Sequence, residues 1–335
     1  GVKGGLTVGK LDRKLDIKTL PKQSTPQWKL SLSDVNVKNV DFRFDDENAP
    51  KISKGIDYNH LNIKQLNLEA KNLNYTTNTN ALSGDIQSFA VKEQSGLNLE
   101  KLRTDFTYTT HGVQLKKLYL KTENTLLQNE VTVQYASLEE LKTNPGILGI
   151  NANMQKSRVA FKDILLFAPD LVQIPFFKNN INSVANINGR IVGKLNNLIL
   201  PNLDVSGIGS SRVSVSGRII GLPDAEKAWY NLNIKNLQVS AQDIDKLVDK
   251  GTIPSSIQLP QNSIIKGTFK GKVNNFNTNL ALNSSFGNAH VKTSFDNQIK
   301  NKEKYNGVAE LDNFDLGKLI KDSSVGKITM KANVK

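Results

Sequence analysis

The feature that most constrains the fold is an alternation of apolar and polar residues that recurs along most of the chain. In the stretch WKLSLSDVNVKNVDFRF the large apolar residues form three groups with period two: Trp28, Leu30 and Leu32, then Val35 and Val37, then Val40, Phe42 and Phe44. Alternation over four to eight residues is typical of a strand with one buried face. The sequence therefore predicts an all-β protein.

The same alternation returns in LNIKQLNL (residues 61–68), FTY (106–108), VQLKKLYL (113–120) and VTVQY (131–135), with Asn, Gly, Asp and Ser between the runs. Such residues favour turns. At a spacing of about ten residues per strand, the chain would hold roughly 30 strands. Short helices are predicted at residues 162–169, 241–251, 138–141 and 316–320, with Gly251 capping the second.

An internal repeat marks the second half of the chain. GRIVGKLNN begins at Gly189 and GTFKGKVNN at Gly267, an offset of 267 − 189 = 78 residues, and the match continues to Val213 and Val291. We predict a repeating unit of several strands and a short helix. Its G-x-x-x-G spacing fits neither a Walker loop nor a dinucleotide fingerprint, so these glycines are expected to bend strands or allow close backbone approach.

The predicted organisation follows from this repeat. Residues 1–168 are expected to form the first part of a groove and residues 181–335 a second part that carries the GxxxGK repeats. The segment PDLVQIPFFKNN, residues 169–180, is the predicted bend between the two parts.

Composition excludes several classes of function. Lys and Arg number 44 and Asp and Glu 31, so the net charge is 44 − 31 = +13. The basic residues are scattered and lack neighbouring aromatic platforms, which argues against nucleic acid as a partner. Cysteine is absent, which excludes a disulfide framework and cysteine-based zinc sites. No apolar run approaches the roughly 20 residues of a transmembrane helix.

Residues with catalytic or metal-binding chemistry form no recognisable constellation. The histidines His60, His111 and His290 lie far apart in sequence, and no G-x-S-x-G elbow occurs. We expect all three histidines to be exposed on strands or loops. The acidic turn at residues 45–47 lacks the spacing of a calcium loop and is expected to be a solvated hairpin tip. The sequence thus predicts no catalytic residue, no metal and no cofactor, and therefore not an enzyme.

An apolar face of this length must be covered by something. A second sheet, closure of the sheet on itself, or a long U-shaped groove would each do so. The repeat and the few short helices favour an elongated, mostly antiparallel, curled sheet whose groove acyl chains could occupy. The residues predicted to line the groove are Trp28, Leu30, Leu32, Val40, Phe42, Phe44, Leu66, Leu68, Phe106, Tyr108, Val131 and Val133.

Three stretches resemble a known family: residues 28–45, residues 54–75, and residues 83–108 with the E-x-S-G-L-x-L element at 93–99. They resemble the periplasmic part of TamB-type translocation and assembly proteins in the form found in Bacteroidetes. The later GxxxGK repeats are similar to the broader AsmA-like superfamily of bridge-like lipid transfer proteins.

This resemblance implies a β-taco groove in the periplasm, held to the inner membrane by an upstream anchor. It implies passage of phospholipid between the inner and outer membranes and a part in outer-membrane assembly. It also implies contact with an outer-membrane assembly barrel of the TamA type through regions outside this segment. The chain would then be a middle piece of a longer protein.

Two other classes remain open. A structural or interaction protein, such as a β-solenoid or an adhesin-like stalk without lipid, predicts regular coils of about 20–30 residues with Gly or Asn ladders. The 78-residue offset with loops of variable length favours the groove instead. A soluble β-rich enzyme is disfavoured because no catalytic constellation is present.

Overall fold

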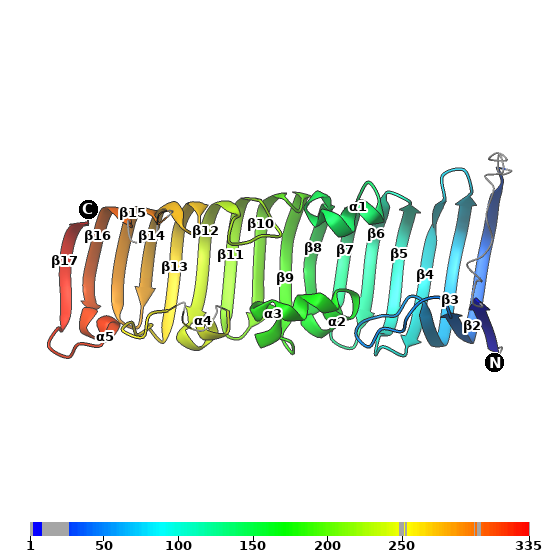
Figure 1. Ribbon diagram of the computed structural model, residues 1–335, viewed down its shortest axis with the longest axis horizontal. Coiled ribbons are helices and arrows are strands. Elements are labelled where there is room, and N and C mark those ends of the chain that lie inside the picture. Colours follow the sequence, from blue (N-terminus) through cyan, green and yellow to red (C-terminus); the bar gives the residue numbers. More distant parts are fainter. Residues whose placement is uncertain are drawn as a thin grey trace. The chain divides into compact units, whose positions relative to one another are not determined.

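A computed structural model describes residues 3–8, 27–247, 251, 253–297, 299 and 303–334. The protein is mostly antiparallel sheet that curls without closing, with a few short helices (Figure 1), which confirms the predicted fold class. Its contacts divide the chain into two compact units. Unit 1 contains Gly1–Ser137 and Ser157–Leu171, and unit 2 contains Leu138–Lys156 and Val172–Lys335.

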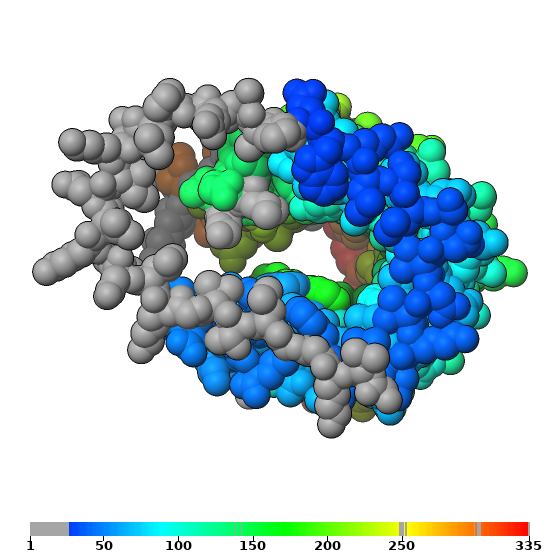
Figure 2. All heavy atoms as spheres, turned by 90° about the vertical axis from the view of Figure 1, so that its right-hand side faces the viewer, coloured from blue at the N-terminus to red at the C-terminus, as the bar shows by residue number. Residues whose placement is uncertain are grey.

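Unit 1 is a sheet in which neighbouring strands follow the order of the sequence. Its strands are β1 (Lys3–Val8), β2 (Lys29–Asp46), β3 (His60–Thr76), β4 (Ala81–Glu93), β5 (Asn98–Thr109), β6 (Gly112–Thr122) and β7 (Leu126–Gln134). β1 pairs parallel to β2, and every pairing from β2 to β7 is antiparallel. Figure 2 shows the blue and cyan atoms of this unit as a curved wall beside a hollow.

Unit 2 repeats the same arrangement with strands of 8–12 residues. They are β9 (Val184–Lys194), β10 (Asn197–Ile208), β11 (Ser211–Ile220), β12 (Trp229–Ser240), β13 (Asn262–Lys272), β14 (Asn275–Ser284), β15 (Gly287–Asp296), β16 (Lys304–Asp315) and β17 (Lys327–Val334). All successive pairings from β9 to β17 are antiparallel. Strand β8 (Gly149–Ala160) gives its first part to unit 2 and its last part to unit 1.

The helices are short and lie at strand ends. They are α1 (Leu138–Thr143), α2 (Phe161–Phe167), α3 (Pro175–Asn179), α4 (Ala241–Leu247) and α5 (Leu316–Ile320), with 3-10 turns η1 (Pro145–Ile147) and η2 (Pro169–Gln173). All four helices predicted from the sequence are present. The end predicted for α4 at residues 248–250 lies outside the described residues, and Gly251 has a positive φ of 89°. Residues 169–180 hold η2 and α3, and the division between the units falls inside them.

The expectation of roughly 30 short strands is wrong, because interruptions of the alternation lie inside long strands. At six interruptions, two polar residues separate inward residues three positions apart, and the second polar residue has a positive φ. These left-handed residues are Asn39, Gln65, Asn72, Lys117, Lys156 and Asn313. At five of them, all except Lys156 on β8, the pairing register shifts as in a β-bulge, so the strand continues with its apolar residues on the same face.

The 78-residue repeat corresponds to secondary structure. β9 and β13 begin at Val184 and Asn262 and end at Lys194 and Lys272, so both ends are 78 residues apart. A Cβ at Gly267 would lie 1.9 Å from the carbonyl oxygen of Asn279 on β14. Close backbone approach, one of the two roles predicted for these glycines, is thereby confirmed.

Candidate functional site

The twelve residues predicted to line a groove lie on unit 1. Trp28 directly precedes β2, and the others belong to β2, β3, β5 and β7. In antiparallel pairs, directly opposed residues project from the same face. One row of directly opposed residues crosses six strands and contains the predicted Leu30, Tyr108 and Val133. Its pairings are Leu30 with Tyr75, Tyr75 with Leu82, Leu82 with Tyr108, Tyr108 with Val113 and Val113 with Val133.

Further rows bring the remaining predicted residues to this face. Phe106 opposes Leu115, which opposes Val131, and Leu68 opposes both Val37 and Phe89. The predicted Val40, Phe42 and Phe44 oppose Leu66, Ile63 and Leu61 on β3. The alternation thus marks one continuous face, which we call the apolar face of unit 1.

One end of this face remains open to solvent. Trp28 is 53% exposed and Tyr108 is 43% exposed, although both side chains are large and apolar. Trp28 contacts the ring of Tyr75 edge-on, with centroids 5.6 Å apart. This end lies at the β3–β4 and β5–β6 turns, and we call it the aromatic end of unit 1.

The opposite end of the face is covered by protein. The connection between β2 and β3, residues 47–59, reaches α2, where the amide of Ile56 donates to the carbonyl of Leu166 over 2.9 Å. Ile56 is buried, as are Val91 and its cross-strand partner Leu99, which is 8% exposed. We call residues 47–59 the strap.

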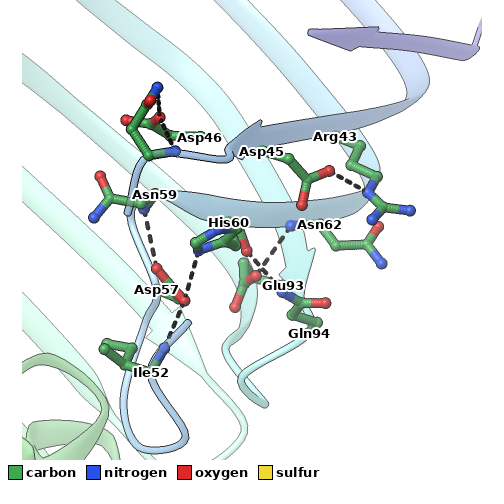
Figure 3. A network of polar contacts seen from close by, with 11 residues as sticks. Arg43, Asp45, Asp46, Ile52, Asp57, Asn59, His60, Asn62, Glu93 and Gln94 are labelled. Carbon is green, nitrogen blue, oxygen red and sulfur yellow. Dashed lines mark hydrogen bonds and ion pairs between the residues drawn. The ribbon is translucent and has the colours of Figure 1, made fainter. Parts of the chain in front are cut away.

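A polar network fixes the strap (Figure 3). Asp57 accepts a hydrogen bond from the amide of Ile52, 3.0 Å away, and its Oδ2 lies 3.0 Å from Nδ1 of His60. Its Oδ1 accepts from the amide of Asn59. Burial raises the pKa of Asp57, but these hydrogen bonds outweigh it and hold that pKa below its ordinary value. Asp57 therefore links the strap to the start of β3.

The network continues into the β4–β5 turn. Glu93 accepts from the amides of Asn62 and Ser95, at 3.2 and 2.7 Å, and the side-chain amide of Gln94 donates to the carbonyl of His60. Burial raises the pKa of Glu93, yet the hydrogen bonds from Ser95 and Asn62 outweigh it and lower the pKa. The strap, β3 and the β4–β5 turn therefore form one hydrogen-bonded end.

Two sequence expectations are corrected here. His60 is only 6% exposed, because it starts a strand beneath the strap, whereas His111 and His290 are exposed as expected. The acidic turn is not a hairpin tip, because the strap separates β2 from β3. Asp45 at the end of β2 pairs with Arg43, and Asp46 accepts from the amide of Asn48 at 2.9 Å.

Unit 2 carries an apolar face that the list of predicted lining residues missed. Five aromatic rings from β12 to β16 follow one another with centroids 4.9–6.3 Å apart. They are Tyr230, Phe269, Phe276, Phe295 and Tyr305. The signal was present in the sequence, because Phe269 and Phe276 lie in the second repeat at positions where apolar and polar residues alternate. We call this end of the face the aromatic end of unit 2.

The other end of this face is again covered. Phe286, Ala289 and Phe314 form a buried cluster against which Leu282, Leu311 and Leu319 of α5 pack. Phe314 is 3% exposed, while Tyr305 at the aromatic end of the same strand is 50% exposed. Each unit thus has an apolar face with one protein-covered end and one open aromatic end.

Two further hollows lie away from the aromatic ends of the units. A depression of about 280 Å³ beside the strap is lined by Arg43, Asp45, Lys51, Asp57 and His60 among others. A second, of about 550 Å³, is lined by Lys266, His290 and Glu310 together with Ile264, Leu282, Ala289 and Leu311, among others. Among the described residues, no group of three or more histidine or carboxylate side chains could hold a metal ion. The described part of the chain also contains no helix with the length and apolar character needed to cross a membrane.

No protein-family model, curated protein or solved structure matches this chain. The arrangement itself must therefore carry any functional conclusion. In each unit it presents apolar side chains in register, left partly exposed at one end.

Proposed function

We propose that this protein binds phospholipid acyl chains on its apolar faces and conducts lipid along them. The observation that carries this proposal is the open aromatic end of the apolar face in each unit, where residues such as Trp28 and Tyr305 are about half exposed. Exposed apolar surface in contact with water costs about 25 cal/mol per Å², which an apolar ligand would recover by covering it.

The resemblance of residues 28–108 to TamB-type proteins supports the wider setting of this proposal. In that setting the chain is part of a periplasmic bridge that carries phospholipid between the inner and outer membranes and supports outer-membrane assembly. An upstream anchor would join it to the inner membrane, and regions outside this segment would meet an assembly barrel of the TamA type.

The antiparallel pairings speak against the β-solenoid alternative. A solenoid coil places equivalent residues of successive coils side by side in parallel strands. Here every pairing from β2 to β7 and from β9 to β17 for which a register is defined is antiparallel. A stalk-like role without lipid is the outcome that the following experiment would favour if the proposal fails.

The test is native mass spectrometry with lipid extraction on protein purified without detergent. We expect co-purified phospholipid, and we expect Tyr108→Asp to lower its amount, because a carboxylate on the apolar face costs several kcal/mol against an acyl chain. Thr107→Asp is the matched control: it adds the same charge at the neighbouring exposed position on the other face. A stable, lipid-free protein, or equal losses in both variants, would contradict the proposal.

A further inference from the structure

Along the strands of unit 2, the apolar face changes character in one direction. Leu282, Ala289 and Leu311 oppose one another across β14, β15 and β16, next to the buried cluster at α5. The next row toward the aromatic end is Leu280, Val291 and Ala309, followed by Thr278, Thr293 and Gly307, and then by Phe276, Phe295 and Tyr305. The face therefore runs from a closed end, buried against Phe286 and Phe314, to an open end with Tyr305.

Charged and amide side chains lie immediately beyond the aromatic row. The last paired positions of the strands are Lys272 with Asn275, Asn275 with Asp296, and Asp296 with Lys304. Neither Lys272 nor Lys304 makes an ion pair with another residue in the part of the chain that the structure describes. Alternation directs them to the other side of the sheet, but at strand ends their long side chains can turn over the edge.

The apolar face of unit 1 also runs from a covered end to an open aromatic end. Its aromatic end has Trp28, Tyr75 and Tyr108, opposite the end that the strap covers. The hydroxyl of Tyr75 donates to Oδ1 of Asn80 at the β3–β4 turn, and the backbone amide of Trp28 donates to Oγ1 of Thr77 at the same turn. Of two Trp and seven Tyr residues in the chain, six lie on the apolar faces at the two aromatic ends: Trp28, Tyr75, Tyr108, Tyr135, Tyr230 and Tyr305.

Tryptophan and tyrosine rings gather where one side of a ring is apolar and the other is wet, as at the headgroup level of a bilayer. We infer that each unit holds phospholipid in one orientation, with the glycerol-phosphate head at the aromatic end and the acyl tails directed toward the covered end. This inference rests on the proposed function, and it adds the position of the headgroup.

The dimensions and the closed end fit this orientation. From Phe276 to Leu282 the strand β14 advances six residues, about 20 Å at about 3.4 Å per residue. One acyl chain spans about 15 Å, half of the roughly 30 Å hydrocarbon core of a bilayer. The reverse orientation would place a phosphate against the buried rings of Phe286 and Phe314, and burying its charge among apolar side chains is unfavourable.

The absence of cysteine from the chain allows a clean test with single labels. Tyr305→Cys reports the aromatic end and Leu311→Cys the covered end of the same strand, and each is labelled with bimane. The protein is loaded with phosphatidylcholine that carries a nitroxide near the glycerol end or at the methyl end of its acyl chain, and excess vesicles are removed. Lys292→Cys on the other face is the control, and Leu280→Cys is a second deep position should Leu311→Cys fail to fold.

We expect the glycerol-end nitroxide to quench the label at position 305 more than the methyl-end nitroxide does, and the opposite order at position 311. Equal quenching at both positions, or the reversed order, would overturn the orientation while leaving lipid binding intact. Quenching that requires intact vesicles would instead make the aromatic end a membrane-docking rim. No quenching by either lipid at positions 280, 305 and 311 would contradict lipid binding itself.

Discussion

The two repeats of unit 2 hold equivalent turns in place by different side-chain interactions. The first repeat comprises β9–β12 and α4, and the second comprises β13–β16 and α5. In the first, Oδ2 of Asp243 accepts hydrogen bonds from the amide and hydroxyl of Ser210, at 2.9 and 2.6 Å, and from the hydroxyl of Ser211. In the second, the ring of Phe286 in the equivalent turn contacts Phe314, with centroids 6.4 Å apart.

The two repeats therefore share one backbone arrangement, whereas the side-chain interaction that holds the turn differs between them. Unit 1 also uses a hydrogen bond to an aspartate: the hydroxyl of Thr122 donates to Oδ2 of Asp163 in α2 over 2.7 Å. Asp163, Asp243 and Asp315 each lie within or directly before a short helix. The hydrogen bonds to Asp243 depend on an ionised carboxylate, whereas the contact between Phe286 and Phe314 does not depend on pH.

The largest effect is expected where the two repeats share a backbone requirement. Gly189 and Gly267 have φ angles of 146° and 135°, and a Cβ would lie 2.3 and 1.9 Å from the opposed Asn202 and Asn279 carbonyl oxygens. Replacement of either glycine by Ala should lower the free energy of unfolding by about 4–5 kcal/mol, the sum of backbone strain and overlap. Urea denaturation followed by circular dichroism measures this change.

Gly326→Ala is the matched control, because a Cβ there meets no atom within 4 Å. It should shift the unfolding free energy by less than about 0.5 kcal/mol. Should Gly189→Ala be tolerated while Gly267→Ala is not, the two repeats do not share one backbone rule.

The next effect is specific to the second repeat. Phe314→Ala removes the centre of the buried cluster and should cost about 3 kcal/mol, since it leaves a cavity beside Phe286 and Leu319. The loss should be the same at pH 7 and pH 4 in thermal unfolding. A loss that changes strongly with pH would show that a titrating group, not apolar packing, holds α5.

The smallest effect belongs to the first repeat and depends on pH. Burial raises the pKa of Asp243, but hydrogen bonds from Ser210, Ser240 and Ser211 outweigh it, so the pKa lies below its ordinary value. A carboxylate with a lowered folded pKa adds stability above its unfolded pKa of about 3.9 and loses it as the pH falls through the folded value.

Asp243→Ala should therefore cost about 2 kcal/mol at pH 7 and progressively less below about pH 4. Hydrogen exchange at residues 209–211 is the local measurement, with the Phe286 turn as internal reference. If lowering the pH speeded hydrogen exchange equally in both turns, the hydrogen bonds to Asp243 would not be the pH-sensitive interaction that the geometry indicates.

Much of the apolar face of unit 1 follows from the sequence. Leu30, Phe106 and Val133 were assigned to one face by alternation, and the registers place them there, because side-chain direction in a strand is a local property of the backbone. The aromatic rings of unit 2 were missed although the same rule applies to them.

The sequence by itself determined the β class, the side of the sheet on which apolar residues lie, and the repeat, because a period of two and a fixed offset can be recognised along the chain. Only the tertiary structure decided whether an interruption of that period ends a strand or forms a bulge, since Lys117 and Asn39 adopt the same positive φ without a common side-chain cause. It alone decided which end of each face is covered. That depends on pairs such as Ile56 and Leu166, which are 166 − 56 = 110 residues apart and meet only when the strap folds onto α2.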